Sequence, residues 1–483
     1  MKRIFLLVVL AAWATISRTA VARPNILLIA IDDLNDWVGC LGGHPQAHTP
    51  NIDRLAKQGT LFSNASCQAP ICGPSRISLL SGKYPHENGC YHQPTKAVAK
   101  DRQLVSKFLP LYFSKHGYKT MATGKISHGV PEKSIFEITG IKGSSGPKPP
   151  NQKRFHFTPP DTPFSGTQTD WGVFPKDETL MPDYRSADWA IDRLAEEHDR
   201  PFFLAVGFVR PHVPFYTQQK WFDLFPLDSL QLPEIPIDDL NDVPPTGRAV
   251  NHAPNYPRPE WLRADDNHQL RLCVQAYLAC GAFVDHQVGR VLDSLAASKY
   301  ADNTVVLLFS DHGYHLGEKE VVAKHTAWEE SARVPLIVSV PGMKQSASIS
   351  KSVGLIDIYP TLVDLAGLPA TGQNSGASLV PLLTDPNTKW RNGTLMAWGR
   401  GNFSYRTQRY RYIRYADGSE ELYDHESDPH GWKNLATAKE QAPRIGHLRK
   451  QIPLKLKPLH PATSPKPHNA WFQAYLSENG FGQ

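Results

Sequence analysis

Four stretches of the chain are almost continuously apolar. They cover residues 24–31, 202–209, 304–309 and 335–340. A run without polar alternation is typical of a β-strand that is buried on both faces of a sheet. Between these runs, apolar residues recur with helical spacing at residues 51–58, 104–116, 187–197, 270–297 and 355–366. Buried strands that alternate with amphipathic helices predict an α/β domain with a mainly parallel sheet.

The pattern changes near residue 385. Short strand candidates follow one another at residues 394–398, 403–407, 410–415 and 420–423. Asp417-Gly418 is a favourable hairpin turn between the last two of them. We therefore expect a main domain over residues 23–384 and a smaller C-terminal α+β subdomain with an antiparallel sheet over residues 385–483.

Two further stretches, residues 133–176 and 223–259, are rich in proline, glycine and polar residues and show little periodicity. We expect surface insertions there, because loops of this length often carry function and these would wall a substrate cleft. The composition, 41% hydrophobic and 20% charged, is that of an ordinary globular protein. The chain has no Lys/Arg-rich run with interleaved aromatics, so we expect no nucleic-acid partner.

The N-terminal residues have the pattern of a secretory signal. Two basic residues precede an apolar run over residues 4–14, and Ala20-Val21-Ala22 provides small residues for cleavage. We expect residues 1–22 to be a removed signal peptide; an uncleaved anchor or a buried first helix are the alternatives. No later segment is apolar enough to cross a bilayer, so we expect an exported protein without stable membrane insertion. Its location would be periplasmic, extracellular or lysosomal, depending on the host.

Polar side chains follow three of the predicted strands. Asp32-Asp33, His212 and Asp311-His312 each come just after an apolar run, and in parallel sheets the carboxyl ends of the strands share one edge. An Asp pair after a strand is also typical of a turn or a helix cap. Two such pairs at one edge instead favour a divalent cation site. Carboxylate ligands favour Ca²⁺ or Mg²⁺ over Zn²⁺.

The most specific segment reads Cys-Gly-Pro-Ser-Arg at residues 72–76 and continues to Ser-Gly-Lys at residues 81–83. Alone it is consistent with a proline-containing turn that opens a helix. It resembles the signature of the sulfatase family, in which this cysteine is oxidised to formylglycine. Gly-Lys-x-x-His at residues 124–128, Pro-His at residues 211–212 and Ser-Asp-His-Gly at residues 310–313 also resemble family segments, in family order. The last matches the iduronate-2-sulfatase branch.

The resemblance implies an alkaline-phosphatase-like α/β/α sandwich and a nucleophile made from Cys72. One hydroxyl of the hydrated aldehyde attacks the sulfate sulfur, and the other releases sulfate. The family resemblance favours Ca²⁺ over Mg²⁺, held by Asp32, Asp33, Asp311 and His312 together with residue 72. A formylglycine-generating or equivalent maturation enzyme is the implied partner.

The resemblance also assigns the basic residues. Arg76 and Lys125 would hold the diol, and His128 would be the base for its second hydroxyl. Lys324 and His212 would bind sulfate oxygens, and one of the two would protonate the leaving alcohol. Three further residues near these positions are expected on the substrate side: Arg210, His315 and His325.

We therefore expect hydrolysis of sulfate esters on a sulfated sugar or glycosaminoglycan-like polysaccharide. Two alternatives stay open. One is a phosphodiesterase or phosphonate hydrolase of the same superfamily, because sulfate and phosphate esters are both tetrahedral and need similar cationic groups. The other is a protein that only binds sulfated glycans, in which Cys72 is never converted.

Overall fold

The computed structural model describes residues 23–150, 155, 169–249, 256–257, 259–343 and 347–463, so the predicted signal peptide lies outside it. The centre of the molecule is an eight-stranded sheet with the order β12-β2-β11-β9-β1-β7-β4-β5. Its strands are β1 (Asn25–Ile31), β2 (Thr60–Phe62), β4 (Lys119–Gly124), β5 (Ile138–Lys142), β7 (Phe202–Phe208), β9 (Thr304–Ser310), β11 (Leu336–Ser339) and β12 (Ala347–Ile349). Only β11 runs antiparallel to its neighbours, which confirms the mainly parallel sheet.

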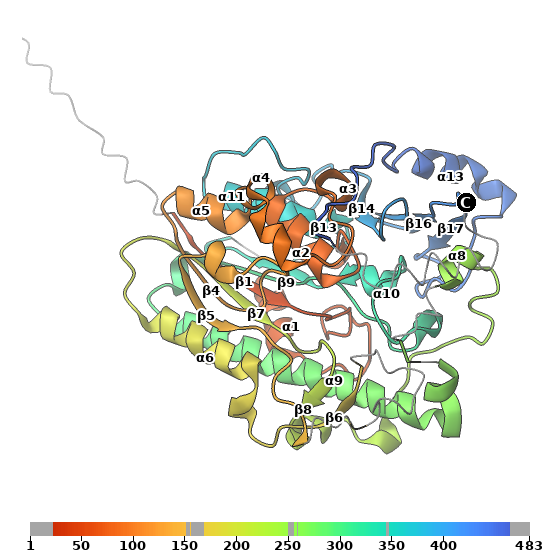
Figure 1. Ribbon diagram of the computed structural model, residues 1–483, viewed down its shortest axis with the longest axis horizontal. Helices are drawn as coiled ribbons and strands as arrows, with labels where there is room; N and C mark the ends of the chain where they lie inside the picture. The colour runs from red at the N-terminus through yellow and green to blue at the C-terminus, as the bar shows by residue number, and fades with distance from the viewer. Residues whose placement is uncertain are drawn as a thin grey trace, which may run out of the picture.

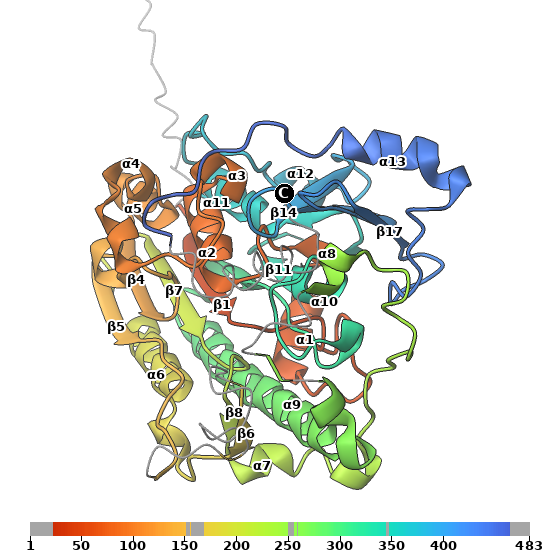
Figure 2. The same ribbon diagram turned by 45° about the vertical axis from the view of Figure 1, so that its right-hand side comes forward.

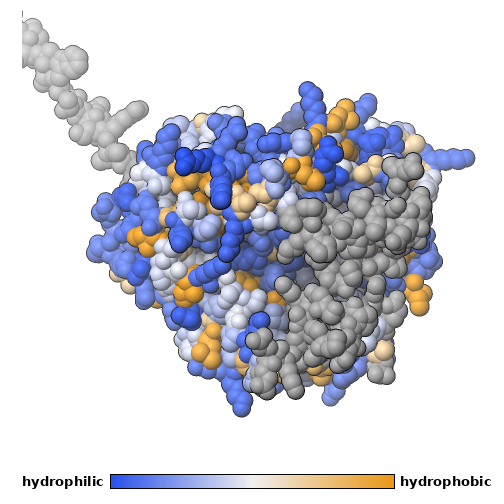
Figure 3. All heavy atoms as spheres, in the orientation of Figure 1, coloured by the Kyte–Doolittle hydropathy of each residue, from blue (hydrophilic) through white to orange (hydrophobic). Residues whose placement is uncertain are grey.

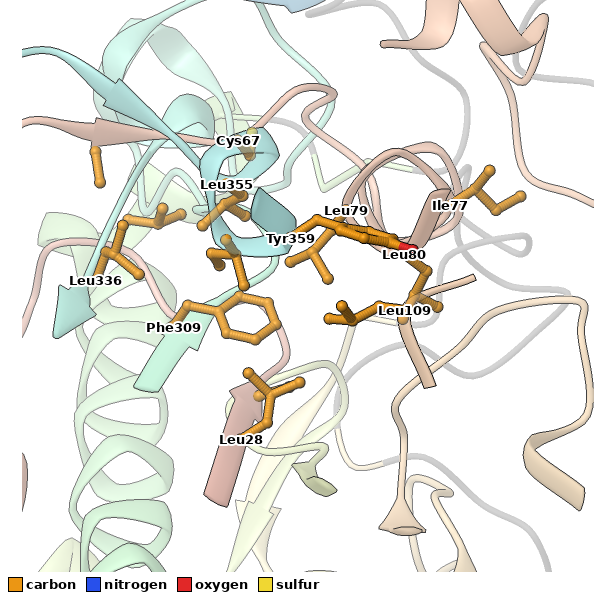
Figure 4. Close-up of a cluster of buried hydrophobic side chains, with 14 of the residues drawn as sticks. Leu28, Cys67, Ile77, Leu79, Leu80, Leu109, Phe309, Leu336, Leu355 and Tyr359 are labelled. Atoms are coloured by element: carbon orange, nitrogen blue, oxygen red, sulfur yellow. The ribbon is translucent and has the colours of Figure 1, made fainter. Parts of the chain in front are cut away.

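The central strands are apolar because both of their faces are covered. In β1, Leu28 and Ala30 belong to one hydrophobic core, while Ile29 and Ile31 belong to the core on the opposite face. Alternate side chains of a strand point to opposite faces, so a strand between two layers of helices needs apolar residues at every position. Figure 4 shows Leu28 and Phe309 of the sheet facing Leu79 and Tyr359 in the first of these cores.

Helices cover the sheet on both sides (Figures 1 and 2). One face packs against α2 (Cys72–Ser81), α5 (Leu109–Lys115) and α11 (Ile358–Leu365). The other face packs against α1 (Pro50–Gln58), α6 (Pro182–Ala195) and α9 (Pro259–Ala297). The result is the expected α/β/α sandwich.

Residues 104–116 differ from the prediction of one helix. They form two shorter helices, α4 (Arg102–Val105) and α5, with a break before Leu109. Pro110 has no N–H to donate to the carbonyl four residues earlier, so one continuous helix cannot pass through this point. The sequence analysis also missed β4, whose residues Lys119–Gly124 contain two threonines and no apolar run.

The C-terminal sheet consists of β14 (Gly393–Ala397), β15 (Phe403–Thr407), β16 (Tyr410–Arg414) and β17 (Glu420–Asp424), each antiparallel to the next. The predicted hairpin turn is confirmed: Gly418 has φ 88° and its N–H donates to the Tyr415 carbonyl at 3.0 Å. Helix α13 (Ala442–Arg449) packs on one face of this sheet. Met396 and Ile413 on the other face join the core of the main domain. The boundary at residue 385 stays a prediction.

Short elements complete the described chain. Three two-residue strands form a small sheet, and two three-residue strands pair near α9: β3 (Ala65–Ser66), β10 (Arg333–Val334), β13 (Val353–Gly354), β6 (Trp171–Val173) and β8 (Phe215–Thr217). The short helices are α3 (Pro85–Asn88), α7 (Gln219–Phe222), α8 (Pro245–Arg248), α10 (Glu329–Ala332) and α12 (Val380–Thr384).

The surface carries mainly polar side chains. On the face shown in Figure 3, hydrophilic residues predominate and hydrophobic ones lie in small scattered groups. Among the described residues, no helix has the length and apolar character that crossing a bilayer requires. All six cysteines are free thiols.

Candidate active site

The predicted site residues meet where four parallel strands end. Asp32 follows β1, Lys125 follows β4 and Asp311 follows β9, while His212 comes four residues after β7. These strands lie side by side and run in the same direction, so their carboxyl ends share one edge. The N-terminus of α2 reaches the same edge and brings Cys72 to it, beside His312. The expectation of one common edge is therefore confirmed.

Cys72 is surrounded by positive charge. Its Sγ lies 3.2 Å from His312 Nε2 and 3.3 Å from Lys324 Nζ. Burial alone would raise the pKa of the thiol, but Lys125, Lys324, His312 and a hydrogen bond from His128 lower this pKa well below its usual range. Because Cys72 is the first residue of α2, the positive end of the helix dipole acts in the same direction. This pocket stabilises negative charge at the side chain of residue 72.

Four side chains form a group that fits a metal ion. Asp32, Asp33, Cys72 and His312 each offer a ligand atom, and these atoms all lie within 4.8 Å of one another. Asp32 Oδ1 and Asp33 Oδ2 are buried and lack a hydrogen-bond partner in the described part of the chain. A buried carboxylate oxygen without a partner is costly, and a bound cation would remove that cost. The donor set thus fits a divalent cation.

His312 is oriented toward this group by its other ring nitrogen. Its Nδ1 pairs with the Gly313 carbonyl oxygen at 2.9 Å, which directs Nε2 to Cys72 and, at 3.3 Å, to Asp33 Oδ1. Burial lowers the pKa of His312, but Asp311 and Cys72 outweigh burial and raise this pKa to about 9. Coordination through Nε2 therefore requires His312 to release a proton.

Asp311 is placed differently from the other three predicted ligands. Arg76 Nε donates to its Oδ2 at 2.7 Å, and the N–H of Asp33 donates to its Oδ1 at 3.3 Å. Burial raises the pKa of Asp311 to about 6, although Arg76 opposes this shift. Asp311 Oδ1 lies 3.6 Å from His312 Nε2, at the edge of the four-residue group. Its role as a metal ligand stays a prediction.

Arg76 connects three of the segments that build the site. Besides its bond to Asp311, its Nη2 lies 3.5 Å from Asp32 Oδ1, and its Nη1 donates to the carbonyls of Lys125 and Ile126. The side chain is 2% exposed. A buried guanidinium with donors in a fixed plane sets the spacing of the groups around it. Arg76 thus holds the ends of β1, β4 and β9 together.

Lys125 is positioned by glycines. Gly124 adopts φ 76°, and a Cβ added there would lie 1.8 Å from the Gly207 carbonyl oxygen. A Cβ on Gly207 would lie 2.2 Å from the Lys125 carbonyl oxygen. The close approach lets the Lys125 N–H donate to Gly207 at 3.0 Å, and Lys125 Nζ donates to Asp32 Oδ2.

The remaining predicted catalytic residues are only partly buried. Lys324 Nζ donates to Asp33 Oδ1 at 2.6 Å as well as to Cys72. His128 is half-buried and bonds to Cys72. His212 is half-buried, and its Nδ1 pairs with the Val213 carbonyl oxygen at 2.7 Å.

Two of the three residues expected on the substrate side lie elsewhere. Arg210 is 1% exposed, and its three guanidinium nitrogens donate to the carbonyls of Ser145, His212 and Tyr216 at 2.7, 3.0 and 2.9 Å. The two ring nitrogens of the fully buried His315 contact Thr326 Oγ1 and the Glu318 carbonyl oxygen. Both side chains therefore hold loops in place. The third residue, His325, is half-buried, and its ring lies 6.1 Å from that of Trp398.

Two supporting residues were missed by the sequence analysis. Ser75 Oγ donates to the Asp311 carbonyl at 2.5 Å, and Asp183 accepts the N–H groups of Val209 and Arg210 at 2.8 Å. Asp183 opens α6 and so supports the loop that carries His212. Ser75 lies inside the Cys-Gly-Pro-Ser-Arg segment, which was a signal for its importance, whereas nothing in the sequence around Asp183 pointed to its role.

Comparison with known proteins identifies the family. The Sulfatase family model matches residues 24–368, and the model for the C-terminal part of N-sulphoglucosamine sulphohydrolase matches residues 317–457. A sulfatase from Formosa agariphila is 41% identical over 470 residues, which are 95% of this chain and 91% of the relative. Iduronate 2-sulfatase from Mus musculus is 31% identical over 395 residues, 71% of this chain and 69% of the relative.

The fold is shared more widely than the sequence. The solved structure of a phosphonate monoester hydrolase from Silicibacter pomeroyi has a TM-score of 0.69 and 20% sequence identity to this chain. The superposition covers 89% of this chain and 94% of the hydrolase. This likeness shows a common fold. The family match over residues 24–368 and the relatives above 30% identity decide the assignment. The chain belongs to the sulfatase family and is a sulfuric ester hydrolase.

Proposed function

We propose that this enzyme removes sulfate from a sulfated sugar or glycosaminoglycan-like polysaccharide, with a formylglycine made from Cys72 as its nucleophile. The observation that carries the proposal is the surrounding of Cys72: Lys125, Lys324, His128 and His312 all act on one side chain at the start of α2. This concentration of positive charge suits a sulfate group and the negative charge that develops on it.

Formylglycine supplies a hydrated aldehyde, one hydroxyl of which attacks the sulfur of the ester. The Cys72 Sγ marks the place of the two hydroxyls. Arg76 and Lys125 are fixed positive charges beside this place, and His128 is in reach to take the proton of the second hydroxyl.

The leaving alcohol needs a proton, and two residues compete for this role. Lys324 Nζ lies 3.3 Å from Cys72 Sγ, so it reaches the sulfate oxygens. His212 lies four residues after β7, at the same edge of the sheet as Asp32, and acts on Asp32 electrostatically. Either side chain is able to donate the proton, and a pH–rate profile of Lys324→Ala beside that of His212→Ala separates them.

The substrate class rests on the relatives. Iduronate 2-sulfatase, at 31% identity, favours a uronate 2-sulfate in a sulfated glycan. Phosphoryl esters are the second candidate substrate class, because a phosphonate monoester hydrolase has the same fold. Turnover of sulfate and phosphate esters of one alcohol separates the two: a preference for the phosphate ester would contradict our proposal.

The nucleophile is tested by Cys72→Ala. We expect at least a 1,000-fold loss of sulfate release because no other group takes over covalent attack. Cys67→Ala is the matched control, since Cys67 is also a buried thiol and burial raises its pKa. The mass of the peptide containing residue 72, from enzyme made in its native host, reports conversion directly. An unmodified cysteine in active enzyme would overturn the proposal.

The cation is proposed to be Ca²⁺, bound by Asp32, Asp33, Asp311 and His312 with residue 72. When bound, it lowers the pKa of the diol and neutralises sulfate oxygens. We expect CaCl₂ to raise the thermal midpoint of the wild type more than MgCl₂ does, and Asp33→Asn to abolish the rise, because ligand binding stabilises the folded state. Asp188→Asn, at an exposed ion pair with Arg290, should keep the response. An unchanged response in Asp33→Asn would exclude this site.

We also propose that the protein is exported and that its signal peptide is cleaved. The N-terminal pattern of basic, apolar and small residues supports a cleaved signal over residues 1–22. Conversion of Cys72 needs a maturation enzyme in the host. The N-terminal sequence of secreted protein tests the cleavage site.

A further inference from the structure

A cavity lies beside the active site. Its volume is about 730 Å³, within the range of small-molecule sites, and it lies at the carboxyl ends of β4 and β5. These two strands are neighbours at one end of the sheet (Figure 1). Lys125 and His128 line this cavity and also act on Cys72, so the cavity adjoins the place where the sulfate reacts.

The walls of this cavity are basic. Lys96, Lys125, Lys133 and Lys142 line it, with Glu132 as the single carboxylate. Glu132 Oε1 accepts from the N–H of Ser127 at 3.1 Å and from its hydroxyl at 3.0 Å, so this oxygen is bound within the wall. Lys125 is paired with Asp32, but the other three lysines against one carboxylate still give the cavity a positive potential.

Three of these lysines are available to a ligand. Lys96, Lys133 and Lys142 are exposed, and none of them forms an ion pair with another described residue. Exposed lysines are ordinary on a protein surface. Here they come from three separate segments and line one cavity, which is also lined by the predicted catalytic residues Lys125 and His128. Convergence next to the reacting group is what a subsite for an anion requires.

We propose that this cavity binds a second anionic group of the substrate, a carboxylate or a further sulfate on the saccharide that carries the reacting ester. The inference rests on the proposed function and narrows it to polyanionic saccharides. With the reacting sulfate at Cys72, a neighbouring substituent passes Lys125 and His128 and reaches Lys133 and Lys142. Lysine ammonium groups provide the charge, and the Thr139 hydroxyl adds a neutral donor.

The test measures binding to full-length Cys72→Ala protein, which does not consume the ligand. Three uronate 2-sulfate disaccharides are compared by calorimetry: one with a further sulfate on the neighbouring sugar, one without it, and one with the carboxylate reduced to an alcohol. We expect loss of the second anion to raise Kd about tenfold, as for a charge-assisted contact. The disaccharide that shows this loss identifies the anion as sulfate or carboxylate.

The lysine variants assign that effect to the cavity. Lys133→Ala/Lys142→Ala should bring together the Kd values of the disaccharide that carries the second anion and the one that lacks it, and Lys142→Glu should reverse their order. The control Lys57→Ala/Lys115→Ala removes two exposed lysines that precede β2 and β4 at the opposite edge of the sheet, and it should keep the tenfold difference. A difference that survives in Lys133→Ala/Lys142→Ala overturns the inference. Failure of converted enzyme to release sulfate from any of the three would instead overturn the proposed function.

Discussion

Two buried charge clusters of this molecule are built from the same kinds of side chain but differ in how they are satisfied. At the carboxyl edge of the large sheet, Asp32 Oδ1 and Asp33 Oδ2 lack a hydrogen-bond partner among the described residues. At the junction with the C-terminal sheet, both oxygens of Glu329 accept from Arg406, and Oε2 also accepts from Arg411 at 2.7 Å. The first cluster therefore has carboxylate oxygens that are able to accept a ligand. In the second cluster, both oxygens of Glu329 already have donors.

The pKa shifts divide differently, because at the site nearby cations, Lys125 first, outweigh burial and hold the pKa of Asp32 below its usual range. Burial raises the pKa of Glu329, but Arg406 and Arg411 outweigh burial and hold this pKa well below its usual range. At the site, burial raises the pKa of Asp311 to about 6 even beside Arg76. A buried charge cluster that closes on itself is structural, whereas one that leaves carboxylate oxygens without partners is built for a bound ion or substrate.

Removal of Arg76 is the strongest test of this comparison. Arg76→Ala leaves Asp311 without its guanidinium partner and removes a positive charge beside the diol. We expect kcat/KM for a sulfate ester to fall about 1,000-fold, a size typical for loss of a preorganised electrostatic group. Steady-state kinetics of Arg76→Ala and Arg76→Lys measure the effect. Arg76→Lys should recover part of the loss, because it restores the charge without the planar donors. A loss below tenfold in Arg76→Ala would show that Arg76 is structural.

The converse test removes Glu329. Glu329→Gln leaves two buried arginines without their carboxylate, and we expect the free energy of unfolding to fall by about 3 kcal/mol. Denaturant titration measures this loss. The kcat of the folded enzyme should stay within about threefold, because the described contacts of Glu329 do not include the site residues. Glu426→Gln, at an exposed pair with Arg409, should cost about 0.5 kcal/mol or less. A large fall in kcat would contradict the division between the clusters.

The central strands of the fold were predictable from the sequence, because burial on both faces produces continuous apolar runs. Both faces of β1 and β9 are covered, so apolar runs marked them, and the polar residues after them had to lie at the edge. Strand β4 was not predicted, because Thr120 and Thr123 are buried but polar and interrupt the apolar pattern. No local pattern distinguishes such a strand from a loop.

The roles of single basic residues were harder to predict, because they depend on contacts distant in sequence. Arg210 looked like a substrate residue beside His212, yet it donates to main-chain carbonyls that include Ser145, 65 positions away. The hydrogen bond from Arg76 to Asp311 joins residues that are 235 positions apart in the sequence. The cavity lined by Lys96, Lys133 and Lys142 likewise joins segments that no sequence spacing connects.

Glu330 offers a third case for the comparison, a carboxyl on a half-buried side chain. Its Oε2 has no hydrogen-bond partner in the described ranges, as at the active site, and among the described residues the basic group within ion-pair distance of it is His315 at 3.8 Å. Burial lowers the pKa of His315 to about 3, so this ring brings no charge at neutral pH. Burial and the neighbouring Glu318 raise the pKa of Glu330 to about 8. The charge of Lys319 opposes this rise in pKa without reversing it, so Glu330 keeps its proton at neutral pH.

This state makes stability depend on pH. Between the unfolded pKa near 4.5 and the folded pKa of about 8, the native protein holds a proton that the unfolded chain has lost, so stability falls as pH rises through this window. Glu330→Gln removes that dependence, and we expect it to gain up to about 1.4 kcal/mol over the wild type per pH unit within the window, from equal stability near pH 4.5 to its full advantage at pH 8.5. Denaturant titrations at both pH values measure the difference, with the exposed Glu440→Gln as control. An equal difference at both pH values would mean that Glu330 is ionised in the folded enzyme, and that the charge of Lys319 outweighs burial there.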